Sequence, residues 1–358
     1  MSEQLYCFLG ANSARGFFSL YEELLPPERA RRIFLLKGGA GCGKSTLLRT
    51  VGQALEAAGE RPVYILCSGD PESLDGVYDP AAGILLADAT APHVMDAVYG
   101  GVVERYVDLS VCYDMDALTS QRETLLQISD DYRGCYGRAW RWLASEAQAR
   151  SDARTLLETE ETVRKTDRRV RGILGRECRR TGAAGTETRC FLGAVTCRGE
   201  LFCPGTAKAL CPRLYALEDS FGLSDRFLRG IRAGALAAGH RVISCPSPLE
   251  PERLEHLLLP ERGIGFVNQR ALTERETPVR RIRFDAMPGA ETLRAHRQRL
   301  RFLRRSAALL REEAVAELRQ AKQLHDELEA RFNPCVDFDR VRAVAAAVTE
   351  EVRSLLPK

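Results

Sequence analysis

A glycine-rich run at positions 38–45 constrains this chain more than any other feature of its sequence. The run reads GGAGCGKS and fits the pattern G-x-x-x-x-G-K-[ST] at every required position. An apolar stretch at 33–36 precedes it, and a helix-forming stretch at 46–57 follows it. A strand that leads through such a loop into a helix points backbone N–H groups and the positive helix end at one spot, which suits a polyphosphate. The run therefore predicts a phosphate-binding loop; the alternative is a glycine-rich turn that binds nothing.

The residues of this loop have separate expected roles. Lys44 is a catalytic candidate because it is expected to reach the β- and γ-phosphates of a nucleotide, and the Ser45 hydroxyl is expected to ligate Mg²⁺. The glycines allow positive φ angles and a close approach of the backbone to the ligand. The predicted nucleotide-binding residues are Gly38, Gly39, Ala40, Gly41, Cys42, Gly43, Lys44, Ser45 and Thr46.

Three carboxylates further along the chain are candidates for the metal site and for catalysis. Asp88 ends an apolar stretch, and a buried strand that places an acid beside the loop supports Mg²⁺ directly or through water. The next residue is Ala89, so the adjacent glutamate of many fast ATPases is missing. Asp70 and Asp75 are candidates to position a water molecule or an acceptor hydroxyl, although 70–73 reads equally well as a capped turn.

The chain also contains an internal repeat. The sequence CFLGA at 7–11 recurs letter for letter at 190–194, and the stretch 61–88 is echoed by 240–268. Five residues keep one offset: Pro71, Leu74, Pro80, Gly83 and Ile84 correspond to Pro251, Leu254, Pro260, Gly263 and Ile264. Two copies of one domain follow, and they meet near the small residues at 182–185.

The second copy lacks the features that would bind a nucleotide. The segment 213–230 falls where 32–49 falls in the first copy, which places Asp225 at the position of Lys44 and Arg226 at that of Ser45. Asn268 likewise replaces Asp88. An anion in place of a phosphate-binding cation turns attraction into repulsion of about 4 kcal/mol per charge pair at 4 Å and an effective dielectric near 20. The second copy is therefore predicted to be a degenerate pseudo-domain.

Strands that alternate with helices at short spacing predict an α/β fold, with two tandem P-loop NTPase-like domains built on parallel sheets. The expected strands are 5–9, 32–37, 62–67, 83–88 and 102–109, then 189–194, 213–217, 241–245, 263–267 and 280–285. The expected helices of the first half are 17–25 and 44–58.

Each copy then continues as a helical hairpin. The predicted domains are 1–181, with a hairpin at about 115–178, and 188–358, with a hairpin at about 290–356; the return helices are 152–178 and 337–356. Apolar residues at seven-residue spacing predict packing between the two arms of each hairpin, and the alternative is a contact in a homo-oligomer or with a protein partner.

Composition narrows the class of protein. The 358 residues are 45% hydrophobic and 28% charged, with a net charge of +3, as in an ordinary globular protein. No signal peptide is recognisable and no apolar run approaches about 18 residues, so we expect a cytoplasmic protein without membrane contact. Arginine clusters at 164–180 and 280–311 could follow a phosphate backbone, but aromatic residues are sparse there and acidic residues flank them. Nucleic acid is thus a possible partner that the sequence does not favour.

The chain resembles a poorly characterised bacterial family of tandem P-loop ATPase-like proteins. The resemblance is carried by FLGANSARGFFS at 8–19, LLKGGAGCGKSTLLR at 35–49, SGDPESLDG at 68–76 and DATAPH at 88–93, and it covers essentially the whole chain. It implies nucleotide binding in the first half. The family tends to keep a recognisable phosphate loop in the second half too, so the loss of that loop here argues against a two-site mechanism.

These observations leave three functions open. The first is an ATP-binding P-loop NTPase that hydrolyses slowly and whose nucleotide state controls the arrangement of domains or hairpins. The second is a small-molecule kinase, in which Asp70 or Asp75 accepts a hydroxyl proton. The third is a nucleotide-gated module that binds nucleic acid or protein. The expected cofactors are ATP and Mg²⁺; GTP is disfavoured because the chain has no N-K-x-D motif.

Overall fold

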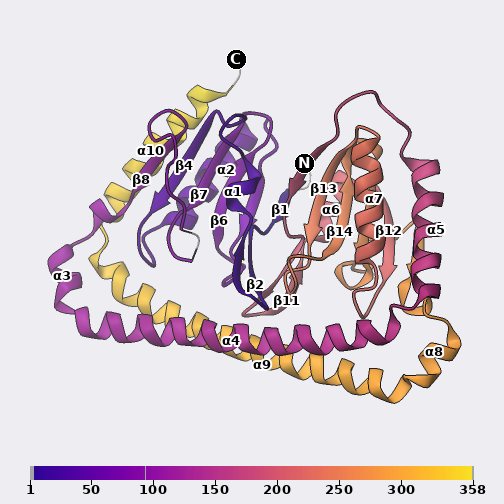
Figure 1. The fold of residues 1–358 in the computed structure, drawn as a ribbon. Helices are drawn as coiled ribbons and strands as arrows, with labels where there is room; N and C mark the ends of the chain where they lie inside the picture. The colour runs from indigo at the N-terminus through magenta and orange to yellow at the C-terminus, as the bar shows by residue number, and fades with distance from the viewer. Residues whose placement is uncertain (1–3, 93, 357–358) are drawn as a thin grey trace.

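The computed structural model describes residues 4–92 and 94–356 of this chain. Within these residues the protein is an α/β structure with two six-stranded mixed sheets, one built from each half of the sequence. The sheets stand side by side, and two long helices run beneath both of them (Figure 1). No helix in this part of the chain is both long and apolar enough to cross a membrane.

The first sheet has the strand order β1-β5-β6-β7-β4-β8. Its apolar strands β4 and β7 lie next to each other and in parallel, so the carboxyl end of β4, where the glycine-rich run begins, lies beside the end of β7. Helix α2 packs its buried leucines and valine against this sheet. The strands are β1 (Leu5–Cys7), β4 (Arg32–Lys37), β5 (Val63–Leu66), β6 (Leu74–Asp79), β7 (Ile84–Asp88) and β8 (Glu104–Asp108), and the helix is α2 (Lys44–Ala57).

The second sheet repeats this topology strand for strand. Read from β9, its order is β9-β13-β14-β15-β12-β16, and α7 takes the place of α2. The repeat seen in the sequence is therefore a repeat of the fold. The elements are β9 (Thr186–Arg189), β12 (Arg213–Glu218), β13 (Arg241–Pro246), β14 (Leu254–Leu259), β15 (Ile264–Asn268), β16 (Arg280–Arg283) and α7 (Asp225–Ala237).

The expectation of parallel sheets was wrong for one strand in each half. β6 runs antiparallel to both β5 and β7, and β14 runs antiparallel to both β13 and β15. Parallel neighbours need a crossover of a dozen or more residues, and the connections 67–73 and 80–83 are too short for one. The strand LDGVYD of β6 is absent from the predicted strands.

A short β-hairpin follows the first strand of each half. β2 (Gly10–Ser13) pairs with β3 (Gly16–Ser19), and β10 (Gly193–Thr196) pairs with β11 (Gly199–Phe202). The helix expected at 17–25 is reduced to residues 21–24, because β3 occupies 17–19, and the strand expected at 189–194 is divided between β9 and β10. The short helices are α1 (Tyr21–Leu24), α3 (Met115–Ser120), α6 (Pro204–Leu210) and α8 (Ala290–Ala295).

The two halves meet along a backbone bridge between Phe8 and Phe191, the equivalent residues of the CFLGA repeat. The N–H of each residue donates to the carbonyl of the other, at 2.9 and 2.8 Å. Both phenyl rings are fully buried. Because equivalent residues pair with each other, the two copies are related by a local twofold arrangement at this point.

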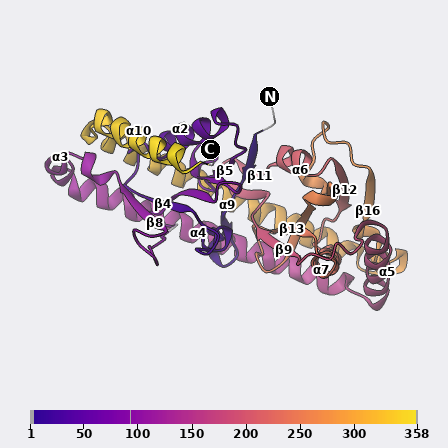
Figure 2. The same ribbon diagram turned by 90° about the horizontal axis from the view of Figure 1, so that it is seen from above.

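The long helices do not form hairpins within their own copies, which corrects the expected packing between hairpin arms. α4 (Arg122–Leu157) packs along α9 (Arg297–Phe332), and each has 36 residues. α4 runs from the first half to the second, while α9 runs the opposite way (Figures 1 and 2). Alanine and leucine side chains of both helices share one buried cluster. The seven-residue spacing therefore serves contact between copies.

The return helices consequently cover the sheet of the other copy. α5 (Glu160–Glu177) packs on α7 of the second half, where Val170 lies against Gly230 and Leu174 against Gly234. α10 (Phe338–Leu355) packs on α2 of the first half, and its Val352 is fully buried in the core of that half. Each sheet is completed by a helix from the other copy.

This exchange predicts that a substitution in the C-terminal helix destabilises the N-terminal half. Val352→Ala is expected to cost about 2 kcal/mol, because it removes two buried methyl groups and leaves a cavity. Hydrogen exchange followed by mass spectrometry should speed up at the amides of α2 and leave those of α7 unchanged. The matched control is Val98→Ala, since Val98 is 74% exposed. Faster hydrogen exchange confined to α7 would contradict the packing of α10 on the first half.

Candidate functional site

The glycine-rich loop joins β4 to α2 and has the backbone that its sequence predicts. Gly41 and Gly43 have φ angles of 67° and 87°, which side chains other than glycine rarely adopt. α2 begins at Lys44, directly after Gly43. The free N–H groups and the positive end of a fourteen-residue helix are therefore directed at the loop.

Lys44 and Asp88 lie next to each other at this loop. The Lys44 ammonium donates to the carbonyls of Gly38 and Gly39 at 2.7 and 2.8 Å, and it lies 3.6 Å from a carboxylate oxygen of Asp88. Asp88 is 8% exposed, and its other oxygen accepts hydrogen bonds from the N–H and the hydroxyl of Thr90. A nearly buried lysine–aspartate pair thus stands where the sequence places a phosphate and a cation.

Ser45 and Asp75 lie on the β6 side of the loop. The Ser45 hydroxyl accepts a hydrogen bond from the Leu74 N–H at 3.0 Å. Asp75, the next residue of β6, is 5% exposed. Burial raises the pKa of the Tyr21 hydroxyl, and the charges of Asp75 and Asp88 raise it further. The structure therefore brings Lys44, Ser45 and Asp88 together, and Asp75 directly follows the residue that donates to Ser45.

Asp70 lies at the rim of this site and is held in an ion pair. One carboxylate oxygen accepts the N–H of Glu72 at 3.2 Å, as in a capped turn. The other lies 3.4 Å from the ammonium of Lys322, which belongs to α9 of the second copy. Both readings of the sequence, a capped turn and a residue of the site, are compatible with this position.

The end of α9 and the start of α10 pack onto the glycine-rich loop. The Gly39 N–H donates to the hydroxyl of Tyr113 at 2.5 Å, and the Tyr113 ring lies 5.9 Å from that of Phe332. A Cβ atom on Gly41 would lie 2.4 Å from the Asn333 side-chain oxygen, and one on Gly43 would lie 3.0 Å from Val341. The loop is therefore in direct contact with the second copy.

Two tyrosines of α4 also approach this region. The Tyr136 hydroxyl would lie 2.5 Å from a Cβ atom on Gly69, and Tyr136 stacks edge-on against Tyr132. Burial raises the pKa of Tyr132 to about 12, so its hydroxyl stays protonated at neutral pH. These two tyrosines, together with Tyr113 and Lys322, were not among the residues predicted from the sequence for this site. Of these four residues only Tyr132 belongs to the seven-residue pattern, which looks the same for a core residue and a site residue.

The equivalent loop of the second copy is one residue shorter. The strand registers make Arg32 equivalent to Arg213, which is 181 positions later. The helix contacts make Ser45 equivalent to Asp225, which is only 180 positions later, so one residue is missing from the second loop. The Leu254 N–H donates to Asp225 at 2.7 Å, as the Leu74 N–H donates to Ser45. Asp225 therefore occupies the position of Ser45. The sequence alignment, which placed Asp225 at the position of Lys44, was wrong by one residue. Ser224 takes the place of the lysine, so the cation is still missing.

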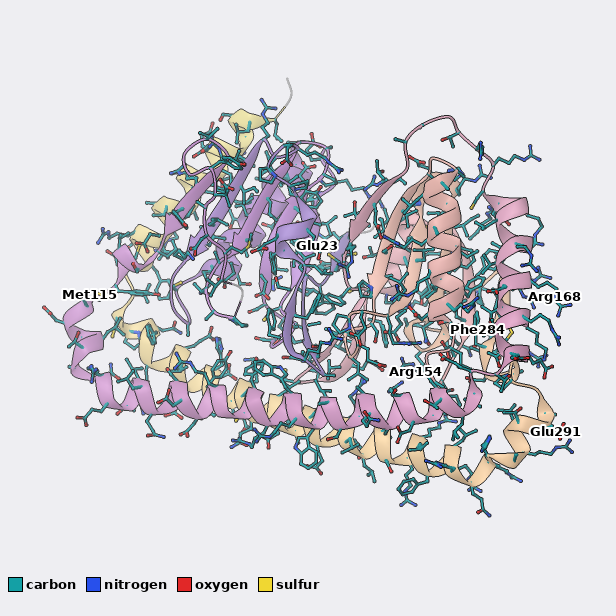
Figure 3. The ribbon with its side chains drawn as sticks, in the orientation of Figure 1. Glu23, Met115, Arg154, Arg168, Phe284 and Glu291 are labelled. Carbon is teal, nitrogen blue, oxygen red and sulfur yellow. The ribbon has the colours of Figure 1, made fainter. Side chains whose placement is uncertain are left out.

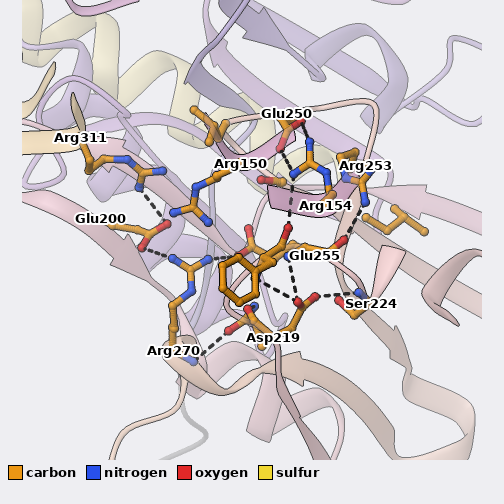
Figure 4. Close-up of a pocket in the computed structure, with 16 residues that line it drawn as sticks. Arg150, Arg154, Glu200, Asp219, Ser224, Glu250, Arg253, Glu255, Arg270 and Arg311 are labelled. Atoms are coloured by element: carbon orange, nitrogen blue, oxygen red, sulfur yellow. Dashed lines mark hydrogen bonds and ion pairs between the residues drawn. The ribbon is translucent and has the colours of Figure 1, made fainter. Parts of the chain in front are cut away.

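A carboxylate of the protein itself occupies the inside of this second loop (Figure 4). Asp219 accepts the N–H groups of the four residues from Phe221 to Ser224, at 2.7 to 3.3 Å. These are the donors that a phosphate-binding loop would offer to its ligand. The cavity beside them measures about 40 Å³, which holds water but no nucleotide.

An ion-pair network closes the remainder of this cavity. Arg154 of α4 makes a bidentate pair with Glu250, and Arg270 pairs with Glu200 and Glu255. Burial opposes the ionisation of Glu200, but the neighbouring Arg311 and Arg270 hold its pKa below the ordinary value. Each arginine of the network has a carboxylate partner, so the cavity carries no free charge for an anion.

Comparison of the chain with protein-family models, with curated proteins and with solved structures finds no match. The assignment of a function to this site therefore rests on its geometry.

The role of Asp219 predicts a loss of stability when its charge is removed. Asp219→Asn replaces an acceptor by an amide whose N–H₂ group faces backbone donors, and it is expected to cost about 2–3 kcal/mol. The midpoint of urea unfolding, followed by hydrogen exchange of α7, reports this loss. Asp167→Asn is the matched control, because the side chain of Asp167 is 37% exposed and pairs only with Arg226 at the surface. Equal midpoints for the two variants would contradict the role given to Asp219.

Proposed function

We propose that the first half of this protein binds ATP with Mg²⁺ at the glycine-rich loop and hydrolyses it slowly, and that the bound nucleotide sets the position of α9 and α10. The observation that carries the proposal is the Lys44–Asp88 pair, buried at the start of α2 beneath a loop with two left-handed glycines. Charge-assisted hydrogen bonds from such a lysine and from loop N–H groups are the means by which proteins hold a polyphosphate.

Under this proposal one residue of the site binds phosphate and two bind the metal. Lys44, now bonded to the carbonyls of Gly38 and Gly39, turns to the β- and γ-phosphates, and Ser45 and Asp88 are the groups that would hold the metal. The metal, when bound, neutralises charge on the phosphate oxygens. Thr90 keeps the Asp88 carboxylate oriented through two hydrogen bonds.

Slow turnover follows from the acids near the site. Ala89 supplies no carboxylate after Asp88, and Asp70 is held by Lys322 at 3.4 Å. Asp75 is 5% exposed, which leaves its carboxylate little access to water. A water molecule is therefore positioned without a strong general base, so the rate depends on electrostatic stabilisation of the phosphoryl group.

The contacts between copies give the nucleotide a route to the helices. A phosphate in the loop competes with Tyr113 for the Gly39 N–H, and Tyr113 packs against Phe332 at the end of α9. Lys322 of α9 links the same helix to Asp70. In the second half Arg154 of α4 is paired with Glu250, the equivalent of Asp70. In each half, therefore, this carboxylate is paired with a cation from the long helix of the other copy.

Lys44→Ala is expected to raise the Kd for Mg·ATP at least about 100-fold, because two charge-assisted hydrogen bonds to phosphate are lost. Titration calorimetry of the full chain measures this, with an expected stoichiometry of one ATP. Asp225→Ala, in the second loop, is the matched control and should leave the Kd unchanged. Binding of two equivalents of ATP, or no binding of ATP by the unmodified chain, would contradict the proposal.

The coupling to the helices is tested by Lys322→Met, which removes the cation that holds Asp70 and keeps the length of the side chain. In the unmodified chain we expect ATP to speed hydrogen exchange at amides 332–341, because Tyr113 releases the loop. In Lys322→Met these amides should already exchange faster without ATP, while the Kd changes less than about threefold. Lys208→Met on α6 is the control, and identical exchange in all three proteins with ATP bound or absent would refute the coupling.

A further inference from the structure

The distal end of the second half carries a concentration of positive charge that the nucleotide site does not use. Residues 164–180 and 280–305 contain 17 basic and 4 acidic side chains, a net charge of +13. Because the whole chain has a net charge of +3, all the other residues together carry −10. We call the exposed arginines of these two segments the basic surface; they are Arg164, Arg168, Arg169, Arg171, Arg176, Arg179, Arg180, Arg280, Arg281, Arg283, Arg294, Arg297, Arg299, Arg301, Arg304 and Arg305.

The fold brings the two segments to the same end of the molecule. α5 stands at that end, and α8 and the start of α9 lie next to its base in both views (Figures 1 and 2). Lys165 of α5 donates to the carbonyl of Met287, and a Cβ atom on Gly289 would lie 3.0 Å from Glu161. Two segments about 100 residues apart in the sequence thus contribute to one surface.

The side chains on this surface point away from the protein. On α5, Thr166, Val170 and Ile173 face α7, whereas Arg164, Arg168 and Arg171 follow at helical spacing on the opposite, exposed face. Figure 3 shows Arg168 directed outward from the helix. At the start of α9, Leu300 and Leu303 are buried, and the arginines between and after them are exposed.

Most of these arginines have no acidic partner. Among the described residues, only Arg281 of the basic surface lies within 4.0 Å of a carboxylate, that of Glu218 at 3.9 Å. The acids nearby are engaged elsewhere: Asp167 pairs with Arg226, Glu161 with Lys165, and Asp285 accepts from Ser220. The exposed carboxylate of Glu291 on α8 and the acids Glu158 and Glu160 at the start of α5 mark the boundary of the surface.

We propose that this basic surface binds the phosphate backbone of a nucleic-acid duplex without regard to sequence. Its cations are nearly all arginines, whose planar fork fits a phosphate in a bidentate manner. Arg164 to Arg171 extend over about 10 Å of helix, and Arg297 to Arg305 over about 12 Å. A duplex presents several phosphates over such a length, so several arginines of each segment can contact it at once. Single-strand binding needs aromatic stacking platforms, and Phe302 is the one exposed large aromatic residue within the two segments.

A membrane surface is the less favoured partner for the same cations. A helix that lies on a bilayer presents an apolar face to the lipid. The exposed residues of α5 are arginines, glycines and Glu160, and Phe302 at the start of α9 is a single apolar side chain among arginines, so neither helix presents an apolar face. Electrostatic attraction alone would act on anionic lipid, so vesicles belong in the test as the competing outcome.

The test uses the full chain and a fluorescein-labelled 30-base-pair DNA duplex in fluorescence anisotropy. We expect binding in 50 mM salt, a slope of log K against log salt of about −4 to −5, and an affinity several hundred-fold lower in 200 mM salt. Vesicles with 30% phosphatidylserine, in the same salt, should bind more weakly. No duplex binding in 50 mM salt, a salt slope near zero, or stronger binding to the vesicles would overturn the proposal.

Two independent variants reverse the charge of each segment. Arg164→Glu with Arg168→Glu and Arg171→Glu changes α5, and Arg297→Glu with Arg301→Glu and Arg304→Glu changes α9. Because all six side chains are exposed, both proteins should keep the circular dichroism and melting temperature of the unmodified chain. Each is expected to lose at least about tenfold in duplex affinity and to have a shallower salt slope.

The matched control makes the same change of charge at the opposite end of the molecule. Arg122→Glu with Arg133→Glu and Arg342→Glu alters three exposed arginines of α4 and α10 beside the first half. It should lose less than about threefold in affinity, and a loss equal to that of the surface variants would overturn the proposal. Lys44→Ala should bind the duplex normally, so this inference and the proposed nucleotide site can fail separately.

Discussion

The antiparallel packing of α4 against α9 determines which sheet each of the helices α5 and α10 covers. Its apolar part includes Ala139 and Leu143 of α4 and Ala314 and Leu318 of α9, all nearly or fully buried. Its polar part is the fully buried carboxylate of Glu146, which accepts two hydrogen bonds from Arg311 and one from Arg150. Although burial opposes it, Glu146 and Glu200 raise the pKa of Arg311, so the charges persist inside the interface. Breaking one member of such a pair leaves an uncompensated buried charge, which fixes the register of the helices.

Because the helices cross, neither copy has a complete domain made only of its own residues. The sheet of the first half is covered by α10, and the glycine-rich loop is touched by Phe332, Asn333 and Val341. That loop is therefore in contact with residues nearly 300 positions away in the sequence. The second half is covered by α5 and anchored by Arg154 in the same way.

The two loops differ in what satisfies their backbone donors. In the first, Gly39 donates to the neutral hydroxyl of Tyr113, which a phosphate can replace. In the second, the Asp219 carboxylate accepts four N–H groups and is attached to the chain, so its effective concentration exceeds that of any free anion. In the first loop the acceptor of the backbone N–H is a side chain distant in sequence, whereas in the second loop the acceptor is a carboxylate within the loop itself. The helix α9 then connects the first loop at its end with the basic surface at its start, about 54 Å apart along the helix.

The sequence by itself determined the local elements: the strand, loop and helix around Lys44, the carboxylate of Asp88 at the end of β7, and the repeat that makes the two sheets alike. These follow from short-range rules, namely glycine geometry, apolar periodicity and the spacing of identical residues. It could not decide the strand directions of β6 and β14, which depend on the length of connections once the neighbours are known. It also placed Asp225 one position off, because a single-residue deletion in a loop is visible only when strand register and helix contacts are both in hand. Only the tertiary structure assigned α5 and α10 to the opposite copies and brought Tyr113, Tyr136 and Lys322 to the site, since a seven-residue pattern shows that a helix has a partner and contains nothing that says which partner it is.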